Sequence, residues 1–298
     1  MAEDVAEADL GAMRRQLVGV AYRVLGTVGE SEDAVQEAFA RFAAADRSAI
    51  VEPQAWLTTT TARICLDVLR SARVRREAYV GPWLPEPLVE RLPAGDDPAD
   101  EAARREDISL ALLVVLQALT PEQRVAFVLH DVFAVPFEDV ADVLHISPEA
   151  ARQLATRARR SVAEGRVRHN ASRAEQRRVL TAFLDAVAGG DLERVLELLH
   201  PEVFAVGDGG GVVPAGRRPI VGALAVARFF AGLYRQAIKR GPLQTELVLV
   251  NGDVGVYQQY GDPPLPLVTA VAVADGRITA IYDVVNPAKL TNVLIGRP

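Results

Sequence analysis

The chain has 298 residues and a formal net charge of −6; half of its residues are hydrophobic and only 6% are aromatic. This length and composition predict two or three compact domains and exclude a wholly disordered chain. A single cysteine, Cys65, excludes an internal disulfide framework, and no pair of cysteines or histidines has metal-ligand spacing. We therefore expect neither a structural metal nor a cofactor.

The N-terminal residues and the lengths of the apolar runs predict where in the cell the protein is found. Four acidic residues precede Leu10, which is the opposite of the basic start of a signal peptide. The longest uninterrupted apolar run, 110–116, is far shorter than the roughly 20 residues needed to span a bilayer. We expect a cytoplasmic protein with no membrane partner.

Residues 10–77 have apolar side chains at helical spacing and are predicted to form helices. Gly26 marks the first break, and Ser31 is the expected N-cap of the helix that follows. After Pro53, residues 56–76 are predicted to form one long helix that becomes arginine-rich at its end.

Charged residues are segregated along the chain. Residues 63–77 contain five arginines and residues 149–178 contain nine, whereas acidic groups gather at 30–37 and 86–107. Opposed charge blocks of this kind predict one surface for phosphates and another for a basic protein partner. The alternative is that these blocks are only solvated helix faces.

Residues 81–100 change character, with five prolines and two glycines that cannot sustain a helix. We interpret this stretch as part of a linker. Its apolar pair, Trp83 and Leu84, is unusual for a flexible spacer, because leaving such side chains in water costs roughly 1.5–3 kcal/mol each. The linker is therefore expected to dock on a folded surface.

The most specific pattern lies within residues 120–162. Pro136 precedes a predicted short helix, a turn follows at 145–146, and Ser147 caps a second, basic helix. This arrangement predicts a helix-turn-helix, and its alternative is an ordinary helical hairpin with a solvated basic face. In the helix-turn-helix the expected DNA-binding residues are Arg152, Gln153, Thr156, Arg157, Arg159 and Arg160.

Beyond residue 174 the pattern changes from helical to strand-like. Helical stretches end near residue 200, and later apolar runs are separated by turn signals at 251–253, 261–264 and 275–276. The chain is therefore predicted to be all-helical in its first half and α + β from residue 174 onward.

Several of these motifs resemble those of the extracytoplasmic-function sigma factors, the specificity subunits of bacterial RNA polymerase, over about the first 165 residues. Residues 120–124, 137–141 and 147–152 look like the domain that reads the minus-thirty-five promoter element. The partners that the resemblance implies are promoter DNA and core RNA polymerase, bound through its clamp and flap regions.

The N-terminal motifs extend this resemblance. Residues 32–39 are similar to the helix that grips the polymerase clamp, and residues 55–57 and 63–70 look like the segment that opens the minus-ten element, in which Trp56 is interpreted as a core anchor. The implied polymerase-binding residues are Glu32, Asp33, Gln36, Glu37 and Arg41. The implied DNA-binding residues are Arg63, Arg70, Arg73, Arg75 and Arg76.

The C-terminal part resembles the SnoaL-like, NTF2-like fold, in which helices and a curved antiparallel sheet enclose a conical pocket. Signatures at 83–87, 208–211 and 286–290 are similar to those of the sigma-J-type sigma factors, which carry this fused domain. That subgroup usually has a lysine where Val212 stands and an acidic residue where Ala288 stands.

The signatures and the apolar pair in the linker together predict one interdomain site. Trp83 and Leu84 are expected to dock near the 208–211 loop and the 286–290 tail, so that the C-terminal domain controls the spacing of the two DNA-reading domains. The residues assigned to this regulatory site are Trp83, Leu84, Pro85, Asp208, Gly209, Gly210, Gly211, Asn286, Pro287, Lys289 and Leu290.

Related stand-alone folds include enzymes, so polar groups inside the cone matter. The candidates for inward-facing groups are Asp208, Tyr257, Gln259, Tyr282 and Asp283. Asp208 beside three glycines favours a turn residue over a general base, and no histidine–aspartate pair accompanies it. We expect no enzyme activity, while a small-molecule ligand in the pocket and purely intramolecular control both stay open.

The predicted fold is multidomain, with two all-α sigma domains, the second a helix-turn-helix, followed by an α + β NTF2-like cone. The expected bounds are 8–80 and 107–168 for the sigma domains, 81–106 for the linker and 174–298 for the cone. The predicted function is promoter-specific transcription initiation under control of the C-terminal domain. Two alternatives stay open: a ligand-sensing helix-turn-helix regulator, which would bind promoter DNA without polymerase, and a SnoaL-like enzyme with an accessory DNA-binding half.

Overall fold

The structure, a computed structural model, divides into two compact units. The helical unit comprises residues 1–78 and 115–165, and the sheet unit comprises residues 79–114 and 166–298. The parts of the chain that the structure describes are 7–77, 79–93, 108–165 and 169–293. Within those ranges, no helix combines the length and the apolar character needed to cross a membrane.

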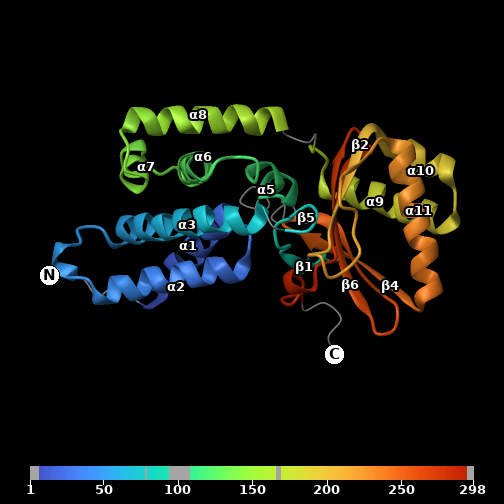
Figure 1. The fold of residues 1–298 in the computed structure, drawn as a ribbon, viewed down its shortest axis with the longest axis horizontal. Coiled ribbons are helices and arrows are strands. Elements are labelled where there is room, and N and C mark those ends of the chain that lie inside the picture. The colour runs from blue at the N-terminus through green and yellow to red at the C-terminus, as the bar shows by residue number, and fades with distance from the viewer. Residues whose placement is uncertain (1–6, 78, 94–107, 166–168, 294–298) are drawn as a thin grey trace. The chain divides into compact units, whose positions relative to one another are not determined.

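Three helices that pack against one another begin the helical unit (Figure 1). Their apolar positions recur every three to four residues, so Leu17, Val35 and Leu57 are buried on the faces where the helices meet. The elements are α1 (Glu7–Leu25), α2 (Val28–Ala44), the short 3-10 turn η1 (Arg47–Ala49) and α3 (Pro53–Glu77).

The start of α2 differs from the sequence prediction. Gly26, with a φ of 82°, ends α1 in the left-handed region, and α2 begins at Val28 behind an extended Thr27. Ser31 lies inside the helix, where it is buried and donates its hydroxyl proton to the carbonyl oxygen of Thr27. The prediction of Ser31 as the N-cap is wrong, because the left-handed glycine allows the next helix to start at once.

A second group of helices completes the helical unit. Helix α6 opens with a capping box, in which the Thr120 hydroxyl accepts from the Gln123 N–H and the Gln123 side chain accepts from the Thr120 N–H. Helices α6 and α7 pack on α3, so the two predicted sigma domains lie in one compact unit. The elements are α6 (Pro121–Phe127), the π-helical turn η3 (Val128–Val132), α7 (Phe137–Leu144) and α8 (Pro148–Gly165). The helix before them, α5 (Leu110–Leu116), contains the change from the sheet unit to the helical unit at residue 115.

The sheet unit is α + β, as predicted. Its sheet has the order β1-β4-β5-β6-β7-β2-β3, and all neighbours are antiparallel except the parallel pair β2 and β7. The helices are α9 (Arg173–Gly189), α10 (Leu192–Leu198) and α11 (Ala223–Arg240), with a 3-10 turn η4 (Pro287–Lys289). The strands are β1 (Val89–Arg91), β2 (Leu199–Asp208), β3 (Ile220–Val221), β4 (Leu243–Val250), β5 (Asp253–Tyr260), β6 (Leu265–Ala274) and β7 (Arg277–Val284).

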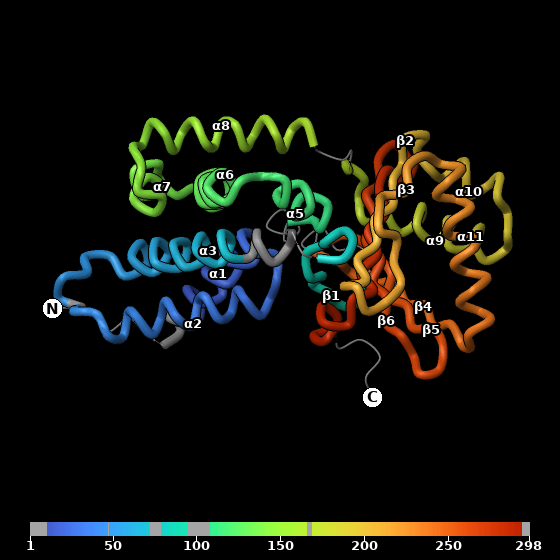
Figure 2. Tube along the Cα trace, viewed as in Figure 1, coloured from blue at the N-terminus to red at the C-terminus, as the bar shows by residue number. Residues whose placement is uncertain are grey.

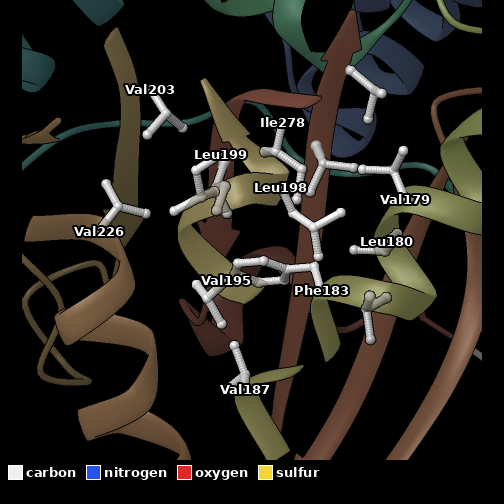
Figure 3. Close-up of a cluster of buried hydrophobic side chains, with 14 of the residues drawn as sticks. Val179, Leu180, Phe183, Val187, Val195, Leu198, Leu199, Val203, Val226 and Ile278 are labelled. Atoms are coloured by element: carbon white, nitrogen blue, oxygen red, sulfur yellow. The ribbon is translucent and has the colours of Figure 1, made fainter. Parts of the chain in front are cut away.

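The core of the sheet unit lies between the helices and one face of the sheet. Val179 and Phe183 of α9, Val195 of α10 and Val226 of α11 are buried there together with Ile278 of β7 (Figure 3). Because successive side chains of a strand point to opposite faces, this face receives alternate strand residues and the other face is left for the rest. The two faces of the sheet carry different sites.

The predicted linker is not devoid of regular structure. Its residues 89–91 form β1, labelled in Figure 2. Strand β1 pairs with β4 in the register Val89 to Val250 and is the edge strand of the sheet. The N–H of Leu88 also donates to the Asn251 side chain at 3.2 Å. The described part of the linker is therefore built into the sheet unit, which the proline-rich composition did not reveal.

Candidate nucleic-acid interface and linker site

Helix α8 has one apolar face and one polar face. Ala151, Ala155 and Ala158 are fully buried, and their small side chains let α8 pack closely on α6 and α7. The six residues predicted to bind DNA all lie on the exposed side: Arg152, Gln153, Thr156, Arg157, Arg159 and Arg160. The second helix of the pair therefore presents a basic surface to solvent.

The turn before α8 has the geometry of a helix-turn-helix. His145 ends α7 in the left-handed conformation, with a φ of 55°. The Ile146 N–H donates to the Ala141 carbonyl at 3.0 Å, and the Ser147 hydroxyl accepts from the Ala150 N–H at 3.2 Å. The backbone groups at the end of α7 and at the start of α8 thus find hydrogen-bond partners within a few residues, which confirms the predicted helix-turn-helix.

Arginines of α8 form ion pairs with carboxylates of the preceding helical turns. Arg152 Nη2 lies 3.3 Å from Glu138 Oε1, and Arg159 Nε lies 2.5 Å from Asp131 Oδ1. Both arginines stay about half exposed. The Arg152–Glu138 pair is exposed on both sides, and such a pair stabilises a fold by no more than about 1 kcal/mol, whereas Asp131 is only 20% exposed.

Helix α2 presents the predicted polymerase-binding residues on one face. Ala34, Val35 and Ala38 are buried on the opposite face. Arg41 Nε pairs with Glu37 Oε1 at 2.8 Å, and both side chains are half exposed. The exposed face holds three carboxylates, one amide and one guanidinium, from Glu32, Asp33, Gln36, Glu37 and Arg41.

Two arginines of α3 contact other helices of the same unit. Arg63 Nη2 donates to the Asp142 carbonyl at 2.7 Å, and Arg70 donates to Glu122 Oε1 from Nε at 3.2 Å and from Nη2 at 2.9 Å. Partial burial opposes ionisation of Glu122, but its own backbone N–H and Arg70 hold the pKa of Glu122 below its usual range. The side chains of Arg73, Arg75 and Arg76 lie outside the described residues.

Trp56 and Cys65 of α3 contribute to the packing of the helical unit. The Trp56 ring is tilted against the Phe42 ring with centroids 5.6 Å apart, which agrees with the interpretation of Trp56 as an anchor. The Cys65 thiol is fully buried, and burial is the main cause that raises its pKa to about 12. Such a thiol stays protonated and is a poor nucleophile.

Asp208, the last residue of β2, is the centre of a buried polar site in the sheet unit. Its Oδ1 accepts from the Tyr79 hydroxyl at 2.5 Å and from the Gly210 N–H at 3.0 Å. Its Oδ2 accepts from the Leu84 N–H at 2.9 Å and from the Lys289 ammonium at 2.6 Å. Four donors satisfy a carboxylate whose burial without partners would be strongly unfavourable.

Lys289 links the linker to the C-terminal tail. Its ammonium also donates to the Leu84 carbonyl, and it lies 4.0 Å from the centroid of the Trp83 ring. Leu84 is only 1% exposed, and Pro85 is buried beside it. The structure thus places Trp83 and Leu84 at both segments to which the sequence assigned them, while a regulatory role of this contact stays a prediction.

Sequence reasoning missed Tyr79, which stands four residues before the tryptophan of the linker. Its hydroxyl donates to Asp208 and accepts from Asn286 Nδ2 at 2.8 Å. Burial, followed by the hydrogen bond to the carboxylate, raises the pKa of Tyr79 well above its ordinary value. A second missed contact joins Asn292 Nδ2 to Glu86 Oε1 at 3.1 Å. The available signal for Tyr79 was an aromatic hydroxyl just before the predicted linker.

The glycines of the loop are required by close packing. A Cβ at position 209 would lie 2.0 Å from the Val213 carbonyl oxygen, so Gly209 has no room for a side chain. Gly210 has a φ of 63°, and a Cβ there would lie 2.5 Å from the Asn286 side chain. Gly211 also has a left-handed φ, of 74°. The loop backbone therefore approaches the tail as closely as only glycine permits.

Two positions that depart from the sigma-J-type pattern lie outside the buried network. Val212 is 75% exposed, and Ala288 is exposed beside an exposed Pro287. The buried cation of the site is Lys289, and Leu290 is buried next to it. The missing charges at the two departing positions therefore do not alter the hydrogen bonds of Asp208.

A separate cavity of about 640 Å³ lies between the sheet and helices α9 and α11. Of the five polar residues expected to point into the cone, only Asp283 lines this cavity. The prediction is wrong for Asp208, Tyr257, Gln259 and Tyr282, because each occupies a strand position that points to the opposite face.

Asp283 is buried and has one hydrogen bond at the cavity. The Thr269 hydroxyl on the neighbouring strand β6 donates to Asp283 Oδ1 at 2.6 Å. Burial raises the pKa of Asp283 to about 6, and the hydrogen bond from Thr269 opposes this shift only in part. A desolvated carboxyl therefore lines an otherwise mainly apolar space.

Two sigma-factor family models match segments of the first 162 residues of the chain, and two relatives match nearly its whole length. The family described as Sigma-70 region 2 matches residues 10–75, and Sigma-70, region 4 matches residues 109–162. The chain is 44% identical over 295 residues to the ECF RNA polymerase sigma factor SigJ of Mycobacterium tuberculosis, covering 95% of this chain and 93% of that protein. It is 34% identical over 293 residues to a probable sigma factor, SigI, of the same species, with coverages of 96% and 95%.

A solved structure extends this likeness to three dimensions. The crystal structure of the Mycobacterium tuberculosis extracytoplasmic function sigma factor SigJ superposes with a TM-score of 0.77 at 42% identity, covering 95% of this chain and 98% of that one. The likeness spans the sigma regions and the α + β unit alike. The chain therefore belongs to the extracytoplasmic-function RNA polymerase sigma factors of the SigJ type.

Proposed function

We propose that this chain acts in the cytoplasm, binds core RNA polymerase, directs it to specific promoters and is controlled by its own sheet unit. The observation that carries the proposal is the presence on one chain of an acidic exposed face on α2 and a basic exposed face on α8 of a helix-turn-helix. A repressor would need only the second surface. A subunit that connects polymerase to DNA needs both.

The exposed face of α2 is proposed to bind the polymerase clamp. Its carboxylates at Glu32, Asp33 and Glu37 would face a basic partner surface, which steers association and selects the partner. The helix-turn-helix would contact the flap region from its own side. These assignments follow from the match to sigma-70 regions 2 and 4 and from exposure of the residues.

The basic helix α8 is proposed to read the minus-thirty-five element. Arg152 and Gln153 lie in its N-terminal half, where a recognition helix reaches base edges, and Arg159 and Arg160 lie further along, where phosphates are in reach. Helix α3 is proposed to bind the minus-ten strand through its arginines. Arg63 would then release the carbonyl that it contacts in this arrangement.

Control is proposed to act through the linker. The helical unit is made of two chain segments, and the chain between them, residues 79–114, belongs to the sheet unit. Asp208 and Lys289 hold the backbone at Leu84, and we propose that this buried contact fixes one point of the chain that leads from α3 to the second DNA-reading part. A shift in that equilibrium would change how far the two DNA-reading parts can separate. We propose no catalytic role for the sheet unit.

Run-off transcription with purified core polymerase tests the proposal. Fragmented genomic DNA serves as template, and the control reaction lacks the chain. We expect transcripts that start downstream of one shared pair of sequence elements and appear only when the chain is added. If the chain instead binds duplex promoter DNA equally well without core polymerase and yields no transcripts, the ligand-sensing repressor is the correct function.

A further inference from the structure

The cavity of the sheet unit has the size and lining of a small-molecule site. Its volume of about 640 Å³ lies within the range of roughly 300–1,000 Å³ that is usual for such sites. Phe183 of α9, Phe230 of α11, Val271 of β6 and Ile281 of β7 contribute to its apolar walls. The cavity lies on the opposite face of the sheet from Asp208, so the linker site does not account for it.

The two buried polar side chains that line this cavity, Thr269 and Asp283, together offer hydrogen-bond acceptors and no free donor. Thr269 and Asp283 are paired across β6 and β7, and both line the cavity. Thr269 has one hydroxyl proton, which it donates to Asp283 Oδ1. The hydrogen-bonding sites that remain on the pair, Asp283 Oδ2 and the Thr269 lone pairs, are acceptors. A ligand that contacts this pair must therefore supply N–H or O–H groups.

The negative charge of Asp283 limits the charge that a ligand of this cavity can carry beside it. Asp283 is 8% exposed, whereas the other charged residues that line the cavity, Asp185, Arg218 and Arg240, are exposed at its rim. A buried carboxylate without a cation beside it is unfavourable, and a cationic nitrogen placed against it removes that cost. A ligand carboxylate would meet repulsion at Asp283 and could reach a guanidinium only at the rim.

We propose that the cavity binds an apolar amine, with its hydrocarbon part between α9, α11 and the sheet and its ammonium on Asp283 and Thr269. Burial raises the pKa of Asp283 to about 6 in the ligand-free protein, so the carboxyl is mainly ionised at neutral pH. Amine affinity should therefore fall as the pH is lowered through 6. Binding itself is independent of the sigma function, and only its effect on transcription rests on the proposed control by the sheet unit.

Three probes with one apolar body test the proposal: 2-naphthylmethylamine, 2-naphthylmethanol and 2-naphthoate. Titration calorimetry on the full chain at pH 7.5, a value at which the amine is charged, measures the affinity of each. We expect the amine to bind about tenfold or more tightly than the naphthoate, since a hydrogen bond to a charged group is worth roughly 1.5–3 kcal/mol. The alcohol should lie between them.

Variants locate the site. Asp283→Asn should weaken the amine about tenfold and leave the alcohol within about threefold, and Thr269→Val should weaken the amine less. Thr279→Val is the matched control, because Thr279 is a buried threonine of the same sheet that donates to the Ala272 carbonyl and does not line the cavity. Leu233→Trp, at a 39% exposed wall position on α11, should block all three probes without placing the larger ring in the core.

Several results would overturn the amine site. They are equal affinity for the naphthoate, unchanged amine affinity in Asp283→Asn, amine affinity that does not exceed that of the alcohol, and absence of saturable binding by any probe. Thermal unfolding of each variant establishes that it is folded at the titration temperature. Since none of these titrations contains polymerase or DNA, their failure leaves the run-off result untouched, and a failed run-off result leaves the titrations interpretable.

Discussion

The basic helix α8 and the linker site both contain ion pairs, but their surroundings are opposite. The side chains of Arg152 and Glu138 are 48% and 66% exposed, whereas those of Lys289 and Asp208 are 8% and 0% exposed. An exposed pair adds little stability and can exchange its carboxylate for a phosphate. Removing one member of a buried pair leaves an uncompensated charge. The charge of Arg152 on α8 is thus accessible to a partner, while the charges of the linker site hold the chain in place.

The largest effect is expected at the buried pair. Lys289→Met should lower the free energy of unfolding of the sheet unit by about 3–5 kcal/mol, because the buried Asp208 loses the cation that is paired with it. The measurement is urea unfolding of the full chain followed by the fluorescence of Trp83. A Trp56→Phe background makes Trp83 the only tryptophan.

Lys239→Met is the matched control for this loss. Lys239 is an exposed lysine in the last turn of α11, and its replacement should change the free energy of unfolding by no more than about 0.5 kcal/mol. Equal losses in the two variants would show that the buried pair contributes no more than an ordinary surface lysine. The comparison between the two regions would then fail.

The next effect concerns the exposed acidic face of α2. The double variant Asp33→Lys and Glu37→Lys should weaken binding to core polymerase on the order of a hundredfold, because attraction to a basic surface becomes repulsion. Fluorescence anisotropy of labelled protein titrated with core measures this. The control, Glu202→Lys with Glu246→Lys, makes the same change in net charge at exposed positions of the sheet unit. An equal loss in both double variants contradicts the assignment of the α2 face.

Asp283 extends this comparison, because it is buried and no cation of the described part of the chain forms an ion pair with it. Its pKa is about 6 in the folded chain against an ordinary value of 3.8, so the folded state binds the proton more tightly. The stability that this proton confers is complete below about pH 4 and is lost as the pH rises through 6.

Asparagine does not titrate. At pH 8 the free energy of unfolding of the sheet unit should therefore be about 1–3 kcal/mol higher in Asp283→Asn than in the wild type. The difference should vanish below about pH 4. Urea unfolding at several pH values measures it. A difference that is the same at pH 8 and pH 4 would mean that the carboxyl does not titrate between them.

The smallest expected effects lie on α8 itself. Arg152→Ala should cost about 1–3 kcal/mol in promoter binding and relax sequence preference in the upstream element. Arg160→Ala should weaken binding to all sequences by a similar factor and lower the salt dependence by about one counterion. Selection of binding sites from a randomised upstream element measures the sequence preference, and binding titrations at several salt concentrations measure the salt dependence. Identical sequence preferences for the wild type and Arg152→Ala would be incompatible with this orientation of the helix.

Local patterns predicted the helical unit well because its elements depend on neighbours in sequence. The spacing of Ala151, Ala155 and Ala158 defines the buried face of α8, and Thr120 and Ser147 cap their helices through contacts three residues away. The start of α2 was placed too late, since the sequence does not show that Gly26 adopts a left-handed φ.

Strands and buried polar sites were harder to predict, because their partners are distant in sequence. Strand β1 pairs with β4 across more than half of the chain, and a run with so many prolines carries no alternating pattern that would indicate it. Tyr79 meets Asp208 over a separation of 129 residues. The direction in which Tyr257 and Tyr282 point depends on register, and a shift of one residue reverses it.

The sequence by itself determined that this protein has a helix-turn-helix with an exposed basic helix, an acidic helix before it and an α + β unit after it. These features depend on periodicity, caps and charge, which act within a few residues. Only the tertiary structure decided that Asp208 is buried and binds the linker, that Lys289 is its cationic partner and that Asp283 lines a cavity. The physical reason is that burial of a charge depends on which distant donors surround it, and chain folding alone brings those donors together.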